Sequence, residues 1–407
     1  MEIFPILSTL RRHKTTALLV ILEIALTCAI VCNAVFLVTQ RIERINMPSG
    51  VAEQELIQVA MADIGKTTDE HARSLQDLAA LRAIPGVKEV ASVNQVPFGR
   101  SSNNSGIKID PKQKLSTLNA TNYYGVNVAQ TLGVQLVAGR LLQESDYVTM
   151  DDAKKAFISG KTEGLPHIVV ITQDMAERMW PGQSALGKQL WMGSDMPLQV
   201  VGVVKNLVRP SIWKDAEAQY SMMIPIGVDD GQYIIRTSPA DRERVRDAAL
   251  ETLKKNNPHR IVWKKELWTD VRAKYFQGDR AMTGLLIGVC VALLVVTALG
   301  IVGLGSFWVA QRRRQIGVRR ALGATRGHIL RYFQTENFLL ATIGIVIGMA
   351  LAYGINVFLM SKYELPRLPG FYLPIGAVAL WLIGQAAVLG PAMRAAAVPP
   401  VVATRSV

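Results

Sequence analysis

Four apolar runs divide the sequence, and each is long enough to cross a membrane as a helix. The runs cover residues 17–38, 281–310, 338–360 and 371–390. A helix needs roughly 20 apolar residues to span the hydrocarbon core, because it rises about 1.5 Å per residue. The first run is longer than the core of a signal peptide, and no cleavage site of small residues follows it. We therefore predict four transmembrane helices, the first of them uncleaved.

The residues between the second and third runs, 311–337, are strongly basic. Within them, residues 311–331 contain seven arginines and no acid. Arginine-rich loops stay on the cytoplasmic side, so four spans place both termini, residues 1–16 and 391–407, in the cytoplasm. Topology and contact with anionic lipid then explain the formal charge of +13, and no nucleic-acid partner is expected.

A short helix with two distinct faces is expected inside this basic stretch, and Gly323 is its natural stop. One face is cationic at helical spacing and surrounds Ile316, which forms an apolar knob. Its arginines are Arg312, Arg313, Arg319 and Arg320. The other face consists of Val318, Ala321 and Leu322. The helix is therefore expected either to lie on anionic lipid or to dock onto a partner protein through Ile316.

A large polar segment, residues 41–280, follows the first span and is expected to fold on the far side of the membrane. Residues 55–62 and 87–96 have strand character and flank a helical pattern at 71–84. A second unit has strands at 233–237 and 260–264 around a helix at 241–256. Two such units around a long insertion predict a mixed α/β domain built from both ends of the segment. The whole chain is therefore expected to be an α+β membrane protein.

The basic stretch QRRRQIGVRRALGAT resembles the signature of the FtsX/MacB family of ABC-transporter permeases, whose usual form is close to R-E-I-G-I-R-R-A-L-G-A. Gln315 stands where the family usually has glutamate. In that family this stretch is the coupling helix that contacts the ATPase subunit. The ATPase-coupling residues implied by the resemblance are Arg313, Arg314, Gln315, Ile316, Gly317, Arg319, Arg320, Ala321, Leu322 and Gly323.

Three further pieces are similar to the periplasmic domain of MacB-type permeases. They are NYYGVNVAQTLGVQLVAGRLLQESD at 122–146, IVVITQDMAERMWPGQSALGKQL at 168–190 and LQVVGVVKN at 198–206. The ending GPAMRAAAVPP is also similar to the end of the family's sequences. The resemblance implies a porter-like subdomain, residues 39–114 and 226–280, with a sabre-like subdomain, residues 115–225, inserted into it.

Small residues in the apolar runs mark places where helices are expected to pack closely. Gly284 and Gly288 form a G-x-x-x-G pair in the second run, and Gly344 and Gly348 repeat it in the third. Glu23 lies inside the first run, where an acid normally faces protein and not lipid. We expect Glu23 to make a packing contact, because no second acid lies in any run to form a transport path with it.

The sequence carries no pattern for catalysis on this chain. Residues 182–189 read GQSALGKQ, close to a phosphate loop, but Gln189 replaces the Ser or Thr that binds Mg²⁺, so a turn is expected. No H-E-x-x-H or G-x-S-x-G pattern occurs. The cysteines, Cys28, Cys32 and Cys290, all lie in apolar runs and cannot form disulfide bonds that stabilise the polar segment. The chain is therefore expected to be neither an enzyme nor a holder of metal or cofactor.

The resemblance implies the permease subunit of a MacB-like ABC transporter in the inner membrane of a bacterium. ATP and Mg²⁺ would bind a separate ATPase subunit. Its hydrolysis cycle would move the periplasmic domain through the long helices, which is called mechanotransmission, and drive export of a drug, a peptide or a similar amphiphile. The spans also lack the row of polar residues that a path through the bilayer would need.

The expected partners are the ATPase, a second permease chain of the same or a different sequence, membrane lipid, and a periplasmic membrane-fusion adaptor with its outer-membrane channel. Two alternatives use the same architecture. One is lipoprotein extraction from the membrane, as in the Lol system, and the other is control of cell-wall hydrolases, as FtsX performs it. An ATP-free membrane receptor is an alternative from a different class, and copurification with an ATPase would distinguish it from the others.

Overall fold

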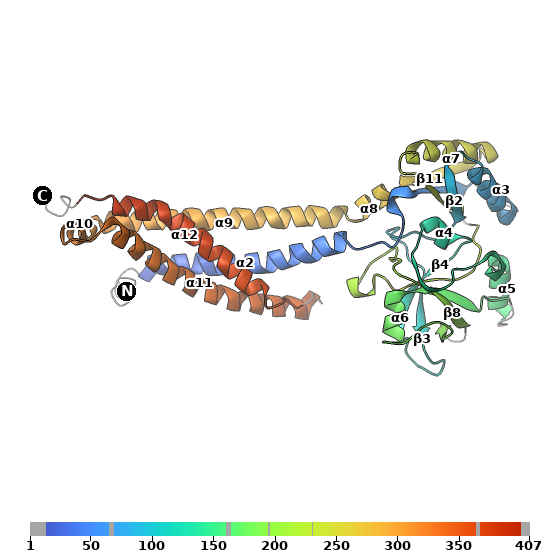
Figure 1. The fold of residues 1–407 in the computed structure, drawn as a ribbon, viewed down its shortest axis with the longest axis horizontal. Coiled ribbons are helices and arrows are strands. Elements are labelled where there is room, and N and C mark those ends of the chain that lie inside the picture. Colours follow the sequence, from blue (N-terminus) through green and yellow to red (C-terminus); the bar gives the residue numbers. More distant parts are fainter. Residues whose placement is uncertain are drawn as a thin grey trace. The chain divides into compact units, whose positions relative to one another are not determined.

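The structure, a computed structural model, describes residues 14–64, 69–159, 164–193, 196–229, 231–363 and 367–399. The chain divides into two compact units (Figure 1). The helical unit falls within Met1–Ile45 and Gly278–Val407, and the inserted unit is Asn46–Gln277. Among the described residues, four helices are long and apolar enough to cross a membrane. The predicted α+β membrane protein is therefore confirmed.

In its described residues, the helical unit is a bundle of four long helices and one short one. The long helices are α2 (Lys14–Ile45), α9 (Gln277–Gln311), α11 (Arg326–Tyr363) and α12 (Tyr372–Ala396), and the short helix α10 (Arg313–Ala321) joins α9 to α11. Helix α11 starts well before its apolar run. The second half of the basic stretch is therefore helical and continuous with the third span.

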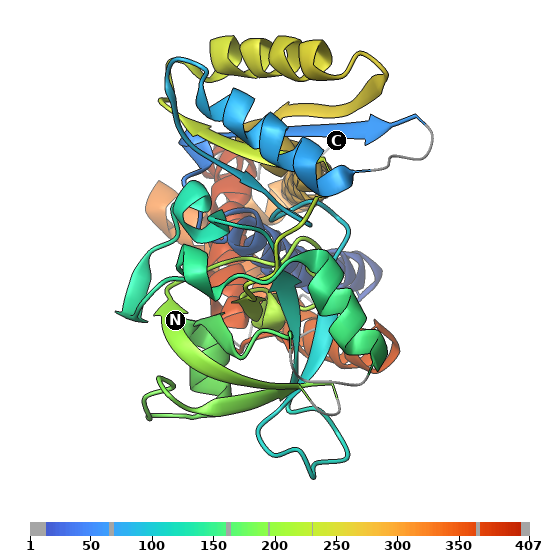
Figure 2. The same cartoon turned by 90° about the vertical axis from the view of Figure 1, so that its right-hand side faces the viewer.

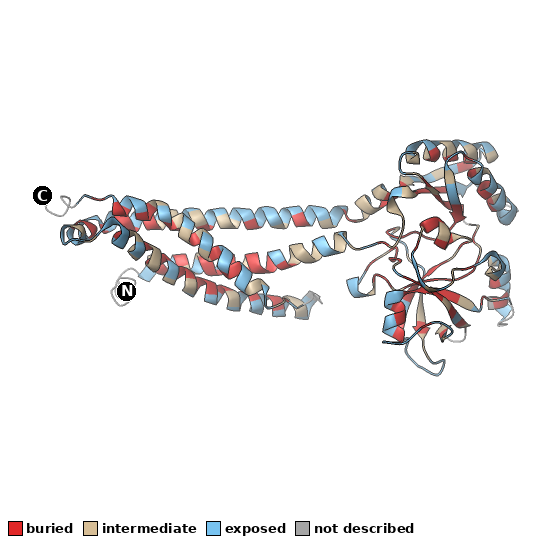
Figure 3. Ribbon diagram, in the orientation of Figure 1, coloured by how far each residue is buried: buried red, intermediate tan, exposed pale blue. Residues whose placement is uncertain are grey.

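Helix α2 forms the core of the helical unit and packs against α11 and α12 (Figure 3). Its inward side includes small residues such as Ala25 and Cys28, so another helix can approach closely. The glycines of α11 lie at this approach. A Cβ on Gly348 would stand 2.5 Å from Cys28 Cβ, and a Cβ on Gly344 would stand 2.9 Å from Ile24 Cβ. Only glycine fits at such distances.

Helix α9 is less covered than α2, and much of its apolar surface faces outward (Figure 3). It contacts α2 at spaced points, one of which is a hydrogen bond of 2.8 Å between the hydroxyls of Thr27 and Thr297. No atom lies within 4 Å of the position of a Cβ on Gly284 or Gly288. This glycine pair therefore makes no close contact within the described helical unit.

Glu23 of α2 packs against α9 at Gly300. A Cβ on Gly300 would stand 2.5 Å from each carboxylate oxygen of Glu23, so the glycine leaves the space that the carboxylate occupies. Glu23, which was expected to make a packing contact, therefore lies against a specific residue of α9.

The first part of the inserted unit is an antiparallel four-stranded sheet in the order β11-β1-β10-β2. Its elements are β1 (Leu56–Asp63), α3 (Glu70–Arg82), β2 (Val87–Ser92), β10 (Gln232–Thr237), α7 (Arg242–Asn256) and β11 (Arg260–Leu267). Helices α3 and α7 lie side by side over the sheet and bury a common core with it (Figure 2). The two predicted β-α-β units therefore combine into one sheet with a layer of two helices packed on it.

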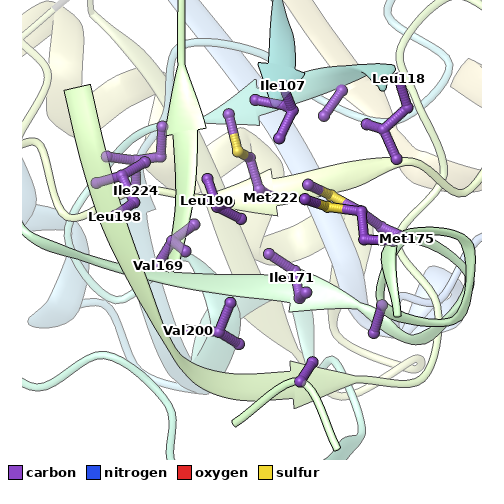
Figure 4. Packing of buried hydrophobic residues seen from close by; sticks show 14 of the residues in the cluster. Ile107, Leu118, Val169, Ile171, Met175, Leu190, Leu198, Val200, Met222 and Ile224 are labelled. Atoms are coloured by element: carbon purple, nitrogen blue, oxygen red, sulfur yellow. The ribbon is translucent and has the colours of Figure 1, made fainter. Parts of the chain in front are cut away.

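The second part is a seven-stranded sheet in the order β5-β8-β6-β9-β4-β3-β7. Its strands are β3 (Asn104–Lys108), β4 (Leu118–Tyr123), β5 (Leu136–Gly139), β6 (Ile168–Thr172), β7 (Gln189–Met192), β8 (Met196–Val204) and β9 (Ser221–Met223). An additional pairing of β8 with β7 closes the sheet into a barrel. Residues such as Val169, Leu190 and Met222 fill its interior (Figure 4).

The described part of the inserted unit has four further short helices: α4 (Val128–Leu132), α5 (Met150–Ser159), α6 (Gln173–Met179) and α8 (Trp268–Tyr275), of which α8 follows β11 and contacts the first sheet. Strand β3 belongs to the barrel, although its residues precede the predicted start of the insertion at residue 115. The two sheets share a second core in which Leu56 and Ile234 of the first sheet meet Tyr123 and Val204 of the barrel. The assignment of the two parts to porter and sabre subdomains stays a prediction.

Two of the sequence pieces that carry the family resemblance have structural roles in the inserted unit. In the piece ending GRLLQESD, Arg140 pairs with Asp146, with Nη2 to Oδ1 at 3.0 Å. Hydrogen bonds from Arg140 hold the pKa of Asp146 below its usual value. Residues 182–188 form the turn that was expected, between α6 and β7. A strand follows them, whereas a phosphate loop requires a helix.

Candidate coupling site at the junction of α9, α10 and α11

A buried ion pair lies where α9 gives way to α10. Helix α9 ends at Gln311, and Arg312 breaks the helix with φ −101° and ψ 12°. Its Nη1 donates to both carboxylate oxygens of Glu336 on α11, each at 2.9 Å. The side chains are only 6% and 2% exposed, and the guanidinium lies over the Trp308 ring, 5.6 Å from its centroid. A charge pair this deep ties the end of α9 to α11, because either charge alone would be costly to bury.

The structure corrects the placement of Ile316. This residue was expected to project toward a partner as a knob on the cationic face, but it is 5% exposed. It packs into a cluster of apolar side chains that joins α10 to the start of α11 and the end of α12. Its neighbours in the cluster are Val309, Ile329, Phe333, Ala392, Ala395, Ala396 and Val398. Ile316 therefore anchors α10 to this chain.

The arginines next to Ile316 also contact their own chain. Arg320 Nη1 donates to the carbonyl oxygens of Ala396 at 3.1 Å and Val398 at 2.7 Å. These carbonyls lie at the C-terminal end of α12, where a cation complements the helix dipole. Arg319 lies over the Tyr332 ring, 4.8 Å from its centroid. Three of the four arginines assigned to the cationic face thus have partners within the helical unit.

The turn after α10 is built from three residues, GAT. Gly323 has φ +98°, a left-handed conformation that favours glycine. The N–H groups of Gly323 and Ala324 donate to the carbonyls of Arg320 and Arg319, at 3.2 and 3.0 Å, which is a Schellman cap. Thr325 then caps α11, since its Oγ1 accepts from the His328 N–H at 3.2 Å. This turn fixes the direction of α10 relative to α11.

The outer side of α10 is basic at its start and has exposed apolar side chains in its second half and at its C-cap. Val318 is 44% exposed and Leu322 is 83% exposed. Arg313, Arg314 and Gln315 are exposed at the start of the helix. Val318 and Leu322 belong to the second face that was expected from the sequence. An exposed leucine and valine beside exposed arginines are typical of a protein interface.

Glu336 and the end of α12 were missing from the predicted site. Glu336 falls just before the third apolar run and is the sole acid in residues 311–361. That isolation, next to many arginines, was a signal for an ion pair. The contribution of α12 carried no such signal, because its residues lie about 75 positions further along the chain. Among the described residues, no group of three or more His, Cys, Asp or Glu side chains gathers to hold a metal.

The fold and this junction together define the class of the protein. It is a membrane protein with four candidate spans, a mixed α/β domain between the first and second spans, and a short basic helix between the second and third spans.

Comparison with known proteins identifies the family. Residues 17–252 match the family model of the MacB-like periplasmic core domain, and residues 287–400 match that of the FtsX-like permease C-terminal region. The chain therefore belongs to the MacB/FtsX-like family of ABC transporter permeases. The expectation drawn from the basic stretch and the three periplasmic pieces is confirmed.

Curated relatives differ in how much of their length this chain spans. It is 24% identical over 337 residues to the uncharacterized ABC transporter permease YknZ of Bacillus subtilis, covering 81% of this chain and 78% of YknZ. It is 28% identical over 353 residues to the pyoverdine export ATP-binding/permease protein PvdT of Pseudomonas putida, covering 82% of this chain and 48% of PvdT. It is 24% identical over 419 residues to the macrolide export ATP-binding/permease protein MacB of Campylobacter jejuni, covering 97% of this chain and 59% of that protein. The chain thus spans about half the length of the ATP-binding/permease relatives.

Two solved structures are similar to part of the chain. The extracellular domain of the transporter YknZ from Gram-positive bacteria matches with a TM-score of 0.32 and 18% identity, over 51% of this chain and all of that one. The periplasmic region of MacB from Actinobacillus actinomycetemcomitans matches with a TM-score of 0.35 and 15% identity, over 57% of this chain and 97% of that one.

Proposed function

We propose that this chain is the permease subunit of an ABC transporter whose ATPase is a separate chain. The ATPase would bind the outer face of α10, and its cycle of ATP binding and hydrolysis would move the inserted unit through α2 and α9. ATP and Mg²⁺ would be held by the ATPase and no cofactor by this chain. The transported substance is proposed to be a drug, a peptide or a similar amphiphile, since relatives are named for macrolide and pyoverdine export.

One observation carries the proposal. Val318 of α10 and the adjoining Leu322 are exposed, while the other side of the helix is fixed to the helical unit by Ile316 and by the Arg312–Glu336 pair. A surface that binds a moving partner transmits its movement only if it is rigidly connected to the rest of the chain. The relatives whose names include ATP-binding support an ATPase as that partner.

The proposed setting is the inner membrane of a bacterium, with α10 and both termini in the cytoplasm and the inserted unit in the periplasm. A second permease chain, of the same or a different sequence, would complete the transporter. The outward apolar surface of α9 offers room for it. A periplasmic adaptor and an outer-membrane channel would extend the route out of the cell.

The orientation is tested with single cysteines at Leu115 and Leu322, which are both 83% exposed. The native cysteines are buried within the helices, so their background reaction is low. In intact spheroplasts, an impermeant thiol reagent is expected to label Leu115→Cys and not Leu322→Cys, while both react after the membrane is opened. Labelling of Leu322→Cys in intact spheroplasts would contradict the four-span orientation.

The coupling role is tested with Leu322→Asp, which places a charge on the most exposed apolar residue of this face. Truncation of a central apolar anchor typically costs about 2 kcal/mol or more of binding, roughly a thirtyfold loss of affinity. We expect ATPase binding and stimulated ATP hydrolysis to fall at least that much, while membrane insertion and thermal stability stay unchanged. Affinity measured by titrating the ATPase onto the permease in nanodiscs checks this.

Leu115→Asp is the matched control, because it alters an equally exposed leucine in the inserted unit. It should leave ATPase binding intact. Removal of the charges in Arg313→Ala and Arg314→Ala separates protein from lipid as the partner of this face. If those changes release the chain from anionic vesicles while Leu322→Asp leaves ATPase stimulation intact, the face binds lipid and the proposed coupling role is wrong.

A further inference from the structure

An apolar pocket opens on the inserted unit beside the barrel. Its volume is about 260 Å³. One wall is α5, where Met150, Lys154 and Ile158 recur every four residues and so share one helix face. Another part of the lining is the hairpin of β7 and β8, where Met192 and Met196 are direct partners in the strand pairing. The pocket is thus built from two elements that the barrel holds in place.

The base of the pocket is continuous with the core of the barrel. Ile226 and Met196 are buried there, at 7% and 8% exposure, and Tyr124 and Met192 pack partly against the same core cluster. A bridge between Val148 and Ile226 sets the chain that leads into α5 against this base. The lining therefore does not depend on the exposed end of α5 alone.

The chemistry of the lining favours an apolar guest. A cavity lined by apolar side chains offers water few hydrogen bonds, and one of about 150 Å³ takes up benzene. This pocket is larger, and Met150, Met192 and Met196 are flexible, polarizable side chains that adapt to guests of different shape. Ile158, at 85% exposure, extends the apolar surface out to the mouth. Isolated apolar side chains on a surface need no explanation, but a hollow lined by them does.

The rim supplies one charge. Lys154 is the charged side chain of the lining and is exposed. Its amine makes no hydrogen bond or ion pair in the part of the chain that the structure describes. The carboxylate of Asp152, two residues before Lys154 in the sequence, instead accepts a hydrogen bond from the Thr149 hydroxyl at 2.7 Å. A ligand whose apolar part fills the pocket would therefore place its polar end beside a free cation.

We propose that this pocket binds an amphiphile made of an apolar group and an acidic head, with the apolar group between α5 and the β7–β8 hairpin and the acid at Lys154. The site lies within the inserted unit and needs neither ATP nor the outer face of α10. It extends the proposed export function by assigning a binding site and a ligand class to the inserted unit. Its test uses no ATPase, so its failure would leave the coupling proposal untouched.

The experiment uses the full chain in lipid nanodiscs with a photoactivatable decanoate that carries a diazirine in its chain. Labelled positions are mapped by mass spectrometry of peptides from the inserted unit. In the unaltered protein, labels are expected on α5 and on the β7–β8 hairpin, with saturation as the probe concentration rises. Labels spread over the inserted unit without preference would overturn the proposal.

One surface variant and one filling variant test the apolar half of the site, and a second surface variant is the control. Ile158→Asp places a charge at the mouth, and Ala153→Phe fills the space behind it; each should lower labelling at least tenfold. Because Ala153 is buried, Ile158→Asp decides the outcome if Ala153→Phe does not fold. Leu115→Asp, similarly exposed and outside the pocket, should label like the unaltered protein. Equal loss in Leu115→Asp and Ile158→Asp would contradict a specific site.

Lys154→Glu tests the acidic head. An exposed ion pair contributes at most about 1 kcal/mol, so we expect about a fivefold loss of affinity for the decanoate probe. The matching decanol probe, which has no charge, should label Lys154→Glu as well as it labels the unaltered protein. Equal effects on both probes would show that the head is not recognised by charge, and the proposed ligand class would be wrong.

Discussion

Glu336→Gln is expected to destabilise the helical unit strongly. The substitution removes the carboxylate that receives both hydrogen bonds from Arg312 Nη1 and leaves a guanidinium buried without its counter-charge. Breaking a buried pair in this way typically costs about 3–5 kcal/mol. A loss of that size should lower the unfolding temperature by on the order of 10 °C, as followed by thermal denaturation of the chain in nanodiscs. An unfolding temperature within about 2 °C of the original would correspond to a loss of no more than about 1 kcal/mol of unfolding free energy and would contradict the importance of the pair.

A double variant separates stability from coupling. Replacing both partners, as in Arg312→Met with Glu336→Met, removes the charges together, and such exchanges are often neutral or stabilising. We expect the double variant to recover the unfolding temperature. It should still couple poorly, because two flexible apolar side chains do not fix the end of α9 to α11 as the charge-assisted hydrogen bonds from Arg312 Nη1 do. Normal ATP-dependent transport by a stable double variant would show that the pair serves stability alone.

The position of this ion pair also shows where sequence reasoning was limited. Helical spacing grouped Arg312 with Ile316 on one face and Val318 with Leu322 on another, and the structure buries the first two residues and exposes the last two. Spacing does not tell which face is buried, and the density of arginine favoured the wrong answer for Ile316. Burial of that face depends on α12, whose last turn supplies Ala392, Ala395 and Ala396 to the cluster.

The larger features followed from local patterns and were predicted. Apolar runs predicted the four spans because length and hydropathy suffice for a membrane helix. Alternating and helical periods predicted the elements of the first sheet, from β1 to β11. The closed barrel was not predicted. Its strands are short, and its closure depends on the pairing of β8 with two neighbours at different points along its length, which no local pattern reports.

Gly348→Leu is expected to have the second large effect, because it forces α11 away from α2. A Cβ at this position would stand 2.5 Å from Cys28 Cβ and 2.7 Å from the Ala25 carbonyl oxygen. The second neighbour is backbone, which cannot turn aside as a side chain can. Overpacking a core typically costs about 1–3 kcal/mol, and contact with rigid backbone places this variant at the upper end or above it. A marked fall in unfolding temperature in nanodiscs would confirm the contact.

Gly288→Leu is the matched control for this change. It adds the same side chain to the other G-x-x-x-G pair, where no atom lies within 4 Å of the new Cβ. The stability of the isolated chain should therefore stay unchanged. Gly284 and Gly288 lie on α9, whose apolar surface faces outward, so close packing there requires a second copy or another permease chain. A Gly288→Leu variant that keeps its unfolding temperature but no longer dimerises would assign this pair to the interface between permeases, whereas unchanged dimerisation would place it against lipid.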